Sequence, residues 1–525
     1  MRSQSPLTHR IVRVLLVLGL LVLPIGQAIP AAAAPAAQSP GVLVIDTTAE
    51  SESMDPGFVT QVSGNSVMSS IFDSLVERGY DGSIQPVLAE SWSYPDNTSV
   101  EFKLRQGVQF HNGEPFHAGA VKFSIDRLMD KSLAAPLAGA MPKTFQGVEV
   151  VDDFTVRFHF SAPEASIFDA LAQCCAIVPP GYYSENTREF VAANPVGSGP
   201  FRFVEWVRDD HTTLAANPSY WGGDTFKGTA QVGTVIFRPV PSAGTRIADL
   251  LNGTADMIFD VSPDDVDTVR GMASSGFQIV PNPAARLQFV EFMPKKATDP
   301  LADRRVRQAL NYAIDVQAMV DNLFKGLGTR AASPILNGSL GYDPSVLPYE
   351  YNPDLARQLL ADAGYGQGFS LTMDMASADN PAAGLAVVGQ LKQIGVDVTP
   401  RTLELATFNA NWSPEKSGDL RIARWGGMQD PAVFLGFTTI CGGFLADPFT
   451  CNQDATALAK QAAGTQDQEA RAALYTQISR ILREDPMGIY LSNAVSIYGL
   501  GPRVQGWKGA TGRDYVIPTY ITLTQ

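Results

Sequence analysis

The chain has 525 residues, 45% of them apolar, and its 53 acidic and 39 basic side chains leave a net charge of −14. Because the chain is acidic and its Lys and Arg residues form no cluster, we expect no nucleic-acid partner. The length is too great for one hydrophobic core and predicts two or three domains.

The first residues have the features of a secretory signal peptide. Arg2, Arg10 and Arg13 precede an uncharged apolar run from Val14 to Ile25, and small residues follow as far as residue 34. This pattern is typical of a cleaved leader, and the apolar run is shorter than the roughly 20 residues that a membrane helix needs. We therefore expect a signal peptide at 1–34. Since no cysteine lies near the cleavage region, we expect a periplasmic protein that is not a lipoprotein.

Short strands and helices alternate along the rest of the chain, which predicts the α/β class. A strand is expected from Val42 to Ile45. Further on, a polar turn at 95–97 precedes a strand in which apolar residues alternate over 100–104. The dipeptide Asn112-Gly113 predicts a second turn, and a helix with apolar residues at 121, 125 and 128 follows it.

Two clusters of Pro and Gly punctuate the middle of the chain, at 194–200 and 217–223. They flank a predicted strand from Phe201 to Val207, and another strand is expected at 156–160. Beyond them, a helix ends at Gly253, a buried strand covers 257–259 and a helix starts at Ser262-Pro263. A helix capped by Asp303 and a late helix over 471–484 complete the pattern.

The four cysteines fall into two pairs. Cys441 and Cys451 flank a Gly-rich, Pro-containing loop, and their spacing favours a disulfide that closes it. Cys174 and Cys175 are adjacent, so they either form a strained vicinal bond or stay reduced as small buried apolar residues; we favour the reduced state.

Several stretches of this sequence together resemble one protein family. They read AESWSYPDNTSVEFKLRQGVQFHNGEPFHAGAVKFSIDR over 89–127, PVGSGP and NPSYWGG in the two clusters of Pro and Gly, DRRVRQALNYAID over 303–315, and YNPDLARQLL over 351–360. In order and spelling, these stretches and the late helix resemble the family 5 extracellular solute-binding proteins. These are the dipeptide, oligopeptide and nickel-chelate receptors of ABC importers.

The resemblance implies a two-lobed periplasmic-binding-protein-like type II fold with an inserted extra subdomain, which closes about a hinge. Lobe I is then discontinuous and comprises 40–81, 196–280 and 492–525, the inserted subdomain is 82–195, and lobe II is 281–491. The implied function is capture of a peptide-like or other small solute in the interlobe cleft and its delivery to an inner-membrane permease. We expect a monomer without a cofactor. A sensor or chaperone on the same scaffold is the alternative, which a locus without permease genes would favour.

The sequence contains no catalytic motif, so a secreted enzyme is the weaker alternative. There is no Gly-x-Ser-x-Gly elbow, no His-Glu-x-x-His and no phosphate-binding Gly-Lys loop. His111 and His117 are the nearest approach to a metal-binding pair, but they lie in the turn block of the family, where we interpret them as structural. We predict no metal site.

The resemblance also suggests which residues contact the solute. Two segments correspond to ligand-facing segments of the family, and their candidate residues are Phe58, Thr60, Gln61, Arg424, Trp425, Met428, Gln429 and Asp430. Trp425 offers a flat face for stacking but can equally pack under a loop. Arg424 can bind a carboxylate but, by alternation with Trp425, can also point away.

One position departs from the peptide-binding members. Those receptors hold the α-amine of the ligand with an Asp three residues after the corresponding Trp, whereas this chain has Met428 there. Asp430 replaces that carboxylate only if the loop shifts. Otherwise the ligand lacks a buried ammonium or carries it elsewhere, which favours chelates, opines, oligosaccharides or modified peptides over ordinary free peptides.

Overall fold

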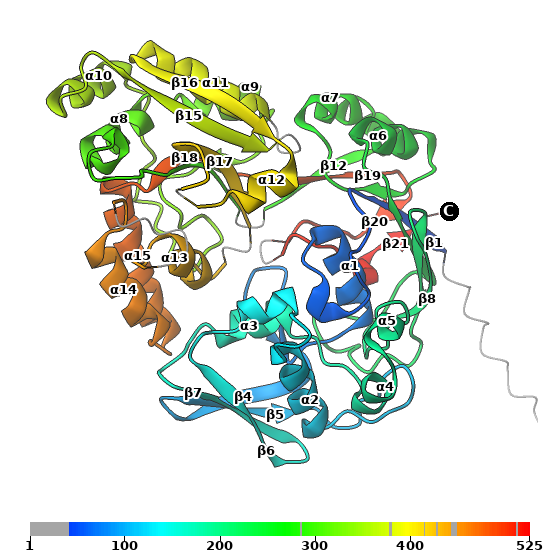
Figure 1. Cartoon of the computed structure of the whole chain (residues 1–525). Helices are drawn as coiled ribbons and strands as arrows, with labels where there is room; N and C mark the ends of the chain where they lie inside the picture. The colour runs from blue at the N-terminus through cyan, green and yellow to red at the C-terminus, as the bar shows by residue number, and fades with distance from the viewer. Residues whose placement is uncertain are drawn as a thin grey trace, which may run out of the picture. The chain divides into compact units, whose positions relative to one another are not determined.

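The structure is a computed structural model that describes residues 41–283, 286–376, 381–413, 415–426, 429–442, 449–510 and 513–524. The predicted signal peptide and Met428 lie outside these ranges. Within them, every helix is too short or too polar to cross a membrane. Residues 40–525 form a single unit, in which three larger sheets are distinguished (Figure 1).

The first sheet is mixed, with seven strands, and β1 lies at its centre. In spatial order it contains β12 (Gln278–Asn282), β19 (Ser496–Leu500), β11 (Met257–Ile258), β1 (Val42–Thr47), β10 (Thr234–Pro239), β9 (His211–Ala216) and β8 (Phe201–Val207). β1 runs parallel to β10 and β11, and the remaining pairs are antiparallel. Leu43 and Ile45 are fully buried, as expected for a central strand.

The second sheet is antiparallel and has four strands. Its order is β4 (Ala89–Asp96), β5 (Ser99–Leu104), β7 (Thr155–Phe160) and β6 (Phe145–Asp152). The alternating residues Val100, Phe102 and Leu104 are buried, as their period of two predicts. The predicted turn at 95–97 is shifted, because β4 continues through Asp96, whose carboxylate accepts hydrogen bonds from the Thr98 backbone and the Ser99 hydroxyl at 2.7 and 2.9 Å.

The third sheet has six strands. Its order is β14 (Thr329–Arg330), β18 (Gly488–Asn493), β13 (Leu287–Phe292), β17 (Leu420–Trp425), β15 (Phe369–Ala376) and β16 (Val396–Leu403). All six residues of β13 are buried, and β15 runs parallel to both of its neighbours. Two further ribbons pair β2 (Val76–Arg78) with β3 (Ile84–Pro86) and β20 (Val504–Gln505) with β21 (Thr522–Leu523).

β12 of the seven-stranded sheet is followed in the chain by β13 of the six-stranded sheet, and β18 of the six-stranded sheet is followed by β19 of the seven-stranded sheet (Figure 1). The two crossings are hydrogen-bonded to each other. The Arg286 amide donates to the side-chain oxygen of Asn493 at 3.1 Å, and the Ala494 amide donates to the Arg286 carbonyl at 2.8 Å. A pair of adjacent crossing segments is the kind of connection about which two parts of a chain can hinge.

Helices surround these sheets (Figure 1). The α-helices are α1 (Val62–Ile71), α2 (Ala118–Met129), α3 (Ile167–Cys174), α4 (Pro180–Glu185), α5 (Arg188–Val191), α6 (Ala243–Asn252), α7 (Pro263–Gly271), α8 (Arg304–Tyr312), α9 (Val316–Asn322), α10 (Pro353–Asp362), α11 (Pro381–Gln393), α12 (Leu405–Ala410), α13 (Ala432–Thr438), α14 (Gln453–Ala463) and α15 (Gln468–Glu484). Short 3-10 helices are η1 (Pro56–Phe58), η2 (Pro136–Ala140), η3 (Ala273–Ser275), η4 (Pro300–Ala302) and η5 (Pro518–Tyr520).

The helix ends follow the local chemistry of the sequence. The Asp303 carboxylate caps α8 by accepting from the Arg305 amide at 2.8 Å, and Gly253 ends α6 with φ of 78°. The start of α7 differs in detail, because the hydroxyl of Ser262 donates to the Asp265 carboxylate at 3.0 Å instead of capping the backbone. α15 begins at residue 468, three residues earlier than predicted, with Asp467 as its cap.

Candidate functional site

A cavity of about 460 Å³ is lined by segments that are far apart in the sequence. Thr60 lines the cavity just before α1, Asn65 lines it in the first turn of α1, and Arg424 lines it near the end of β17. Further wall comes from the end of α3 and from residues 513–515. The cavity therefore draws on elements associated with all three larger sheets, and its size is typical of a pocket for a small molecule.

Charged side chains of both signs line this cavity: Glu77, Asp169, Asp430, Asp514, Arg78, Arg286, Arg424 and Arg513. Two of the arginines are ion-paired with carboxylates of the same wall. Arg78 contacts Asp169, and the Arg286 guanidinium lies 2.7 Å from the Asp514 carboxylate, a charge-assisted contact. Such pairing fixes the orientation of planar groups that can also bind a polar ligand.

Asp430 is buried, and cationic and polar groups surround it. Its carboxylate accepts hydrogen bonds from the Tyr475 hydroxyl and the Ala432 amide, both at 2.9 Å, and lies 3.1 Å from the Arg471 guanidinium. Burial and the neighbouring Asp430 carboxylate raise the pKa of Tyr475, which therefore stays a neutral donor. Arg471 therefore partly offsets the charge of Asp430, while the buried Oδ2 of Asp430 accepts no hydrogen bond from the residues that the structure describes.

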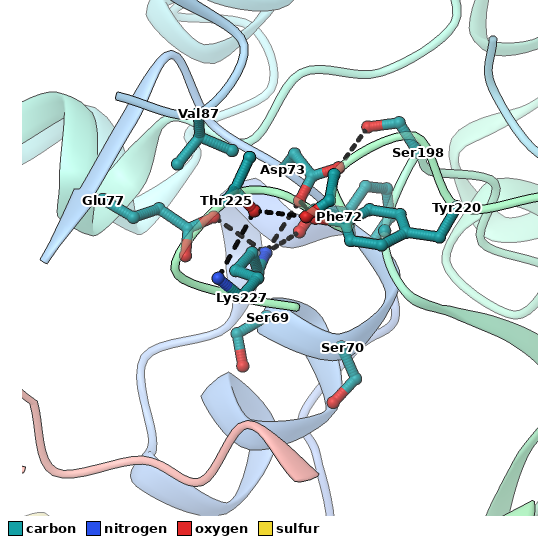
Figure 2. A network of polar contacts seen from close by, with 12 residues as sticks. Ser69, Ser70, Phe72, Asp73, Glu77, Val87, Ser198, Tyr220, Thr225 and Lys227 are labelled. Atoms are coloured by element: carbon teal, nitrogen blue, oxygen red, sulfur yellow. Dashed lines mark hydrogen bonds and ion pairs between the residues drawn. The ribbon is translucent and has the colours of Figure 1, made fainter. Parts of the chain in front are cut away.

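Glu77 belongs to a buried ionic cluster around Lys227 (Figure 2). The Lys227 ammonium donates to the Phe72 carbonyl, the Asp73 carboxylate and the Glu77 carboxylate at 2.9, 2.8 and 2.9 Å, which uses all three of its N–H groups. Burial by itself lowers the pKa of Lys227, but the two carboxylates outweigh it and raise that pKa. Burial raises the pKa of Glu77, and Lys227 opposes this effect. Through Lys227, the cluster links Glu77 of β2 to Phe72 at the end of α1, and both residues line the cavity.

Arg513 is held differently from Arg78 and Arg286. Its guanidinium donates to the Arg78 carbonyl at 3.0 Å and lies 4.4 Å from the ring centre of Tyr80 and 5.4 Å from that of Phe226. Within the described ranges it has no ion pair with a carboxylate, and its buried Nη2 has no hydrogen-bond partner there. The aromatic faces thus support a cation at the cavity wall that retains hydrogen-bonding capacity.

Some of the predicted contact residues line the cavity and others do not. Thr60, Arg424, Gln429 and Asp430 line the cavity. The lining residues do not include Phe58, Gln61 or Trp425, and Met428 falls outside the part of the chain that the structure describes.

The three predicted residues away from the cavity wall have other surroundings. The Trp425 ring lies 5.4 Å from that of Trp412 and 5.5 Å from that of Phe434, in the apolar cluster beside the six-stranded sheet. Phe58 lies 3.9 Å below the guanidinium of Arg188, and Gln61 is exposed just before α1. Alternation along β17 thus places Arg424, and not Trp425, at the cavity.

The predicted reduced state of Cys174 and Cys175 is wrong. The two residues are buried, as expected, but a disulfide joins them, and both line the cavity. Adjacent side chains in a helix diverge by about 100°. Here Cys174 ends α3 and Cys175 leaves it with φ of −118° and ψ of 55°, so the sulfurs can meet. A second disulfide joins Cys441 and Cys451, the pair that the loop spacing favours.

The two histidines of the turn block have structural contacts. His111 Nε2 is 3.0 Å from the Gly199 carbonyl, and His117 accepts from the Gly119 amide at the start of α2. Burial lowers the pKa of His111 to about 4, a shift that the Gly199 hydrogen bond only partly opposes. Among the residues that the structure describes, His, Cys, Asp and Glu form no group of three suited to a metal ion.

Sequence reasoning missed several lining residues, including Arg78, Arg286, Arg513 and Asp514. Each lies in a short strand or connecting segment with no distinctive local pattern. The adjacent cysteines are a local feature of the sequence that could have pointed to this wall.

Comparison with known proteins gives consistent results. Residues 83–443 match the bacterial extracellular solute-binding proteins, family 5 (middle). The chain is 31% identical over 479 residues to heme-binding protein A of Haemophilus influenzae, covering 84% of this chain and 85% of the relative. It is 30% identical over 352 residues to the glutathione-binding protein GsiB of Pectobacterium atrosepticum, covering 66% of each.

A solved structure agrees with these matches. The ABC transporter-associated periplasmic binding protein DppA from Helicobacter pylori, in complex with the peptide STSA, superposes with a TM-score of 0.77. Its sequence is 27% identical, and the superposition covers 92% of this chain and 98% of DppA. The fold is therefore the predicted two-lobed α/β architecture.

Proposed function

Because the chain belongs to the family 5 bacterial extracellular solute-binding proteins, we propose that it is a periplasmic receptor that captures a small solute and passes it to an ABC permease in the inner membrane. The observation that carries this proposal is the cavity of about 460 Å³, whose wall combines β17 and residues 429–430 with residues around α1, α3 and 513–515. A solute there contacts elements on both sides of the two crossing segments and stabilises their approach.

The polar groups of the wall bear on the class of solute. The charge of Asp430 is partly offset by Arg471, and its Oδ1 already accepts from Tyr475, so a free α-amine held there would gain only the remaining Oδ2 as a hydrogen-bond acceptor. Arg513 lines the cavity with a guanidinium whose Nη2 has no hydrogen-bond partner among the described residues, and such a group suits a carboxylate or another oxyanion. We therefore favour a chelate, an opine or a modified peptide with an acidic group over an oligosaccharide or an ordinary dipeptide.

The remaining parts of the proposal concern location and assembly. The leader pattern at 1–34 supports export and cleavage, and a two-lobed receptor needs no second copy to complete its site. We infer a monomer that performs no reaction, since capture and release suffice for the role. Periplasmic fractionation with N-terminal sequencing of the mature protein tests the export step.

A thermal-shift screen of the purified mature protein tests the capture of a solute. The panel contains hemin, glutathione, the peptide STSA, free dipeptides, nickel–histidine, an opine and a cello-oligosaccharide. A solute that binds only the folded protein raises the melting temperature as its concentration rises. We expect an acidic member to give the largest shift, and no shift with any class would contradict the proposed capture of these solutes.

Site variants locate the binding. Arg513→Gln removes a charge-assisted donor at the cavity wall and is expected to weaken binding of the acidic solute about tenfold or more. Arg480→Gln is the matched control, because Arg480 is an exposed arginine that pairs with Asp343 and does not line the cavity. Equal binding by both variants would place the solute elsewhere.

A further inference from the structure

We propose that Cys174–Cys175 is a redox-reactive site in the wall of the solute cavity, and that its reduction by a dithiol moves a cysteine sulfur into that cavity and weakens solute capture. The effect on capture rests on the proposed function. The reactivity and the movement of the sulfur depend only on the position of the disulfide.

The disulfide borders two cavities. Cys174 and Cys175 line the cavity of about 460 Å³ and also line a second cavity of about 20 Å³. Gly57, Ser124, Leu128 and Val178 contribute to the wall of the smaller space. Cys174 and Cys175 are 4% and 3% exposed, and of the two cavities that they line only the one of about 460 Å³ has room for a small reagent.

Breaking the bond requires space. A disulfide holds its sulfurs about 2 Å apart, whereas unbonded heavy atoms separate to roughly 3.5–4.0 Å. One sulfur must therefore move by more than an ångström, or the two must share that movement.

The surroundings restrict the direction of this movement. The Cys175 sulfur already lies 3.7 Å from the Met141 sulfur and 3.7 Å from the Ala170 carbonyl oxygen. The smaller cavity has room for about one water molecule. The larger cavity is the available space, so the dithiol form narrows it.

The reaction is ordinary thiol–disulfide exchange. A thiolate of the dithiol attacks one sulfur of the pair, which forms a mixed disulfide and releases the other cysteine as a thiolate. The second thiolate of the reagent then displaces the remaining cysteine. The reagent leaves as a cyclic disulfide, and Cys174 and Cys175 gain two electrons and two protons.

The second disulfide provides an internal control. Cys441 and Cys451 are bonded ten positions apart and do not line the cavity. A double Cys441→Ser/Cys451→Ser variant therefore isolates general effects of losing a disulfide from effects at the cavity.

The first experiment treats the folded protein with dithiothreitol, labels the new thiols with iodoacetamide and maps them by mass spectrometry. Crystal structures of the oxidised and the reduced protein then locate the sulfurs. We expect labelling at Cys174 or Cys175 and a sulfur displaced into the larger cavity. A pair that resists dithiothreitol in the folded protein, or a reduced pair that leaves the larger cavity unchanged, would overturn the proposal.

The second experiment measures binding of two probes, S-methylglutathione and the peptide STSA, by calorimetry. We expect the tighter-binding probe to bind about tenfold more weakly to the reduced wild-type protein and to a Cys174→Ser/Cys175→Ser variant. The untreated Cys441→Ser/Cys451→Ser control variant should bind it as tightly as the oxidised wild type. Equal affinity in both redox states would overturn the link to capture. If neither probe binds the oxidised protein, peptide capture fails, and the labelling and the crystal structures of the first experiment decide the redox inference.

Discussion

Replacing Lys227 with methionine tests the buried cluster beside the cavity. Lys227 and Asp73 are completely buried, and Glu77 is almost so. The Lys227→Met substitution keeps a long side chain but removes the charge and three hydrogen-bond donors. Two carboxylates then remain in the interior without their cation, which typically costs about 3–5 kcal/mol of folding free energy.

Urea unfolding followed by tryptophan fluorescence measures this loss. The control is Lys122→Met, because Lys122 is exposed and forms a surface pair with Asp126 at 2.8 Å, which typically contributes less than about 1 kcal/mol. Adding Asp73→Asn and Glu77→Gln to Lys227→Met should restore part of the stability, since the uncompensated charges disappear.

The pH dependence of the folding free energy provides an independent test of the Lys227→Met substitution. Burial raises the pKa of Glu77 in the folded protein, and the loss of Lys227 raises it further. A group with a raised folded-state pKa contributes stability at low pH that is lost as the pH rises through that pKa. The difference between variant and wild type should therefore grow from pH 5 to pH 8. A Lys227→Met protein within 1 kcal/mol of wild type at pH 8 would refute this reasoning.

Three further predictions test the fold. His111 stays neutral in the folded protein because burial lowers its pKa to about 4, so acidification from pH 7 to 5 should reduce the folding free energy of the wild type by about 2 kcal/mol through this residue. Urea unfolding at the two pH values should show a smaller loss of folding free energy in a His111→Gln variant. An equal loss in both proteins would contradict the argument. A Cys441→Ser/Cys451→Ser variant should unfold about 2–3 kcal/mol more easily, since the bridge closes a loop of about ten residues, and an unchanged urea midpoint would argue against this. Gly197→Ala should destabilise the protein by about 1–3 kcal/mol or more, because its new Cβ would lie 2.2 Å from the last carbonyl oxygen of α1. Gly139→Ala is the control, since a Cβ at that position meets nothing within 4 Å. Similar melting temperatures for the two variants would contradict the close packing at Gly197.

Local structure was predictable where neighbouring residues alone decide it. The strand predicted from Phe201 to Val207 has these bounds in the structure, and Asp303 caps its helix as expected. Strand alternation and helix capping involve residues within a few positions of one another, so the sequence carries their signal directly. Two boundaries differ from the prediction. α15 starts earlier because Asp467 caps it, and β4 extends to Asp96, into the segment predicted as a turn.

The candidate site was only partly predictable. Family resemblance located the segment around β17, but whether Arg424 or Trp425 faces the cavity depends on what packs against each side of that strand. The cysteine pair illustrates the same difficulty. Its residues were evident, but its bonding depends on how the chain leaves α3 at Cys175.

The class, the order of the elements and the family follow from periodicity, caps and a long series of ordered motifs, all of which can be read along the chain. Which side chains share the cavity depends instead on how distant segments pack. Arg78, Arg286, Arg424 and Arg513 meet there across more than 400 residues of chain. Asp169 and Asp514 offset the charges of Arg78 and Arg286, because the packing of the sheets brings these carboxylates against the two guanidinium groups. Such contacts are long-range, and no local pattern of residues encodes them.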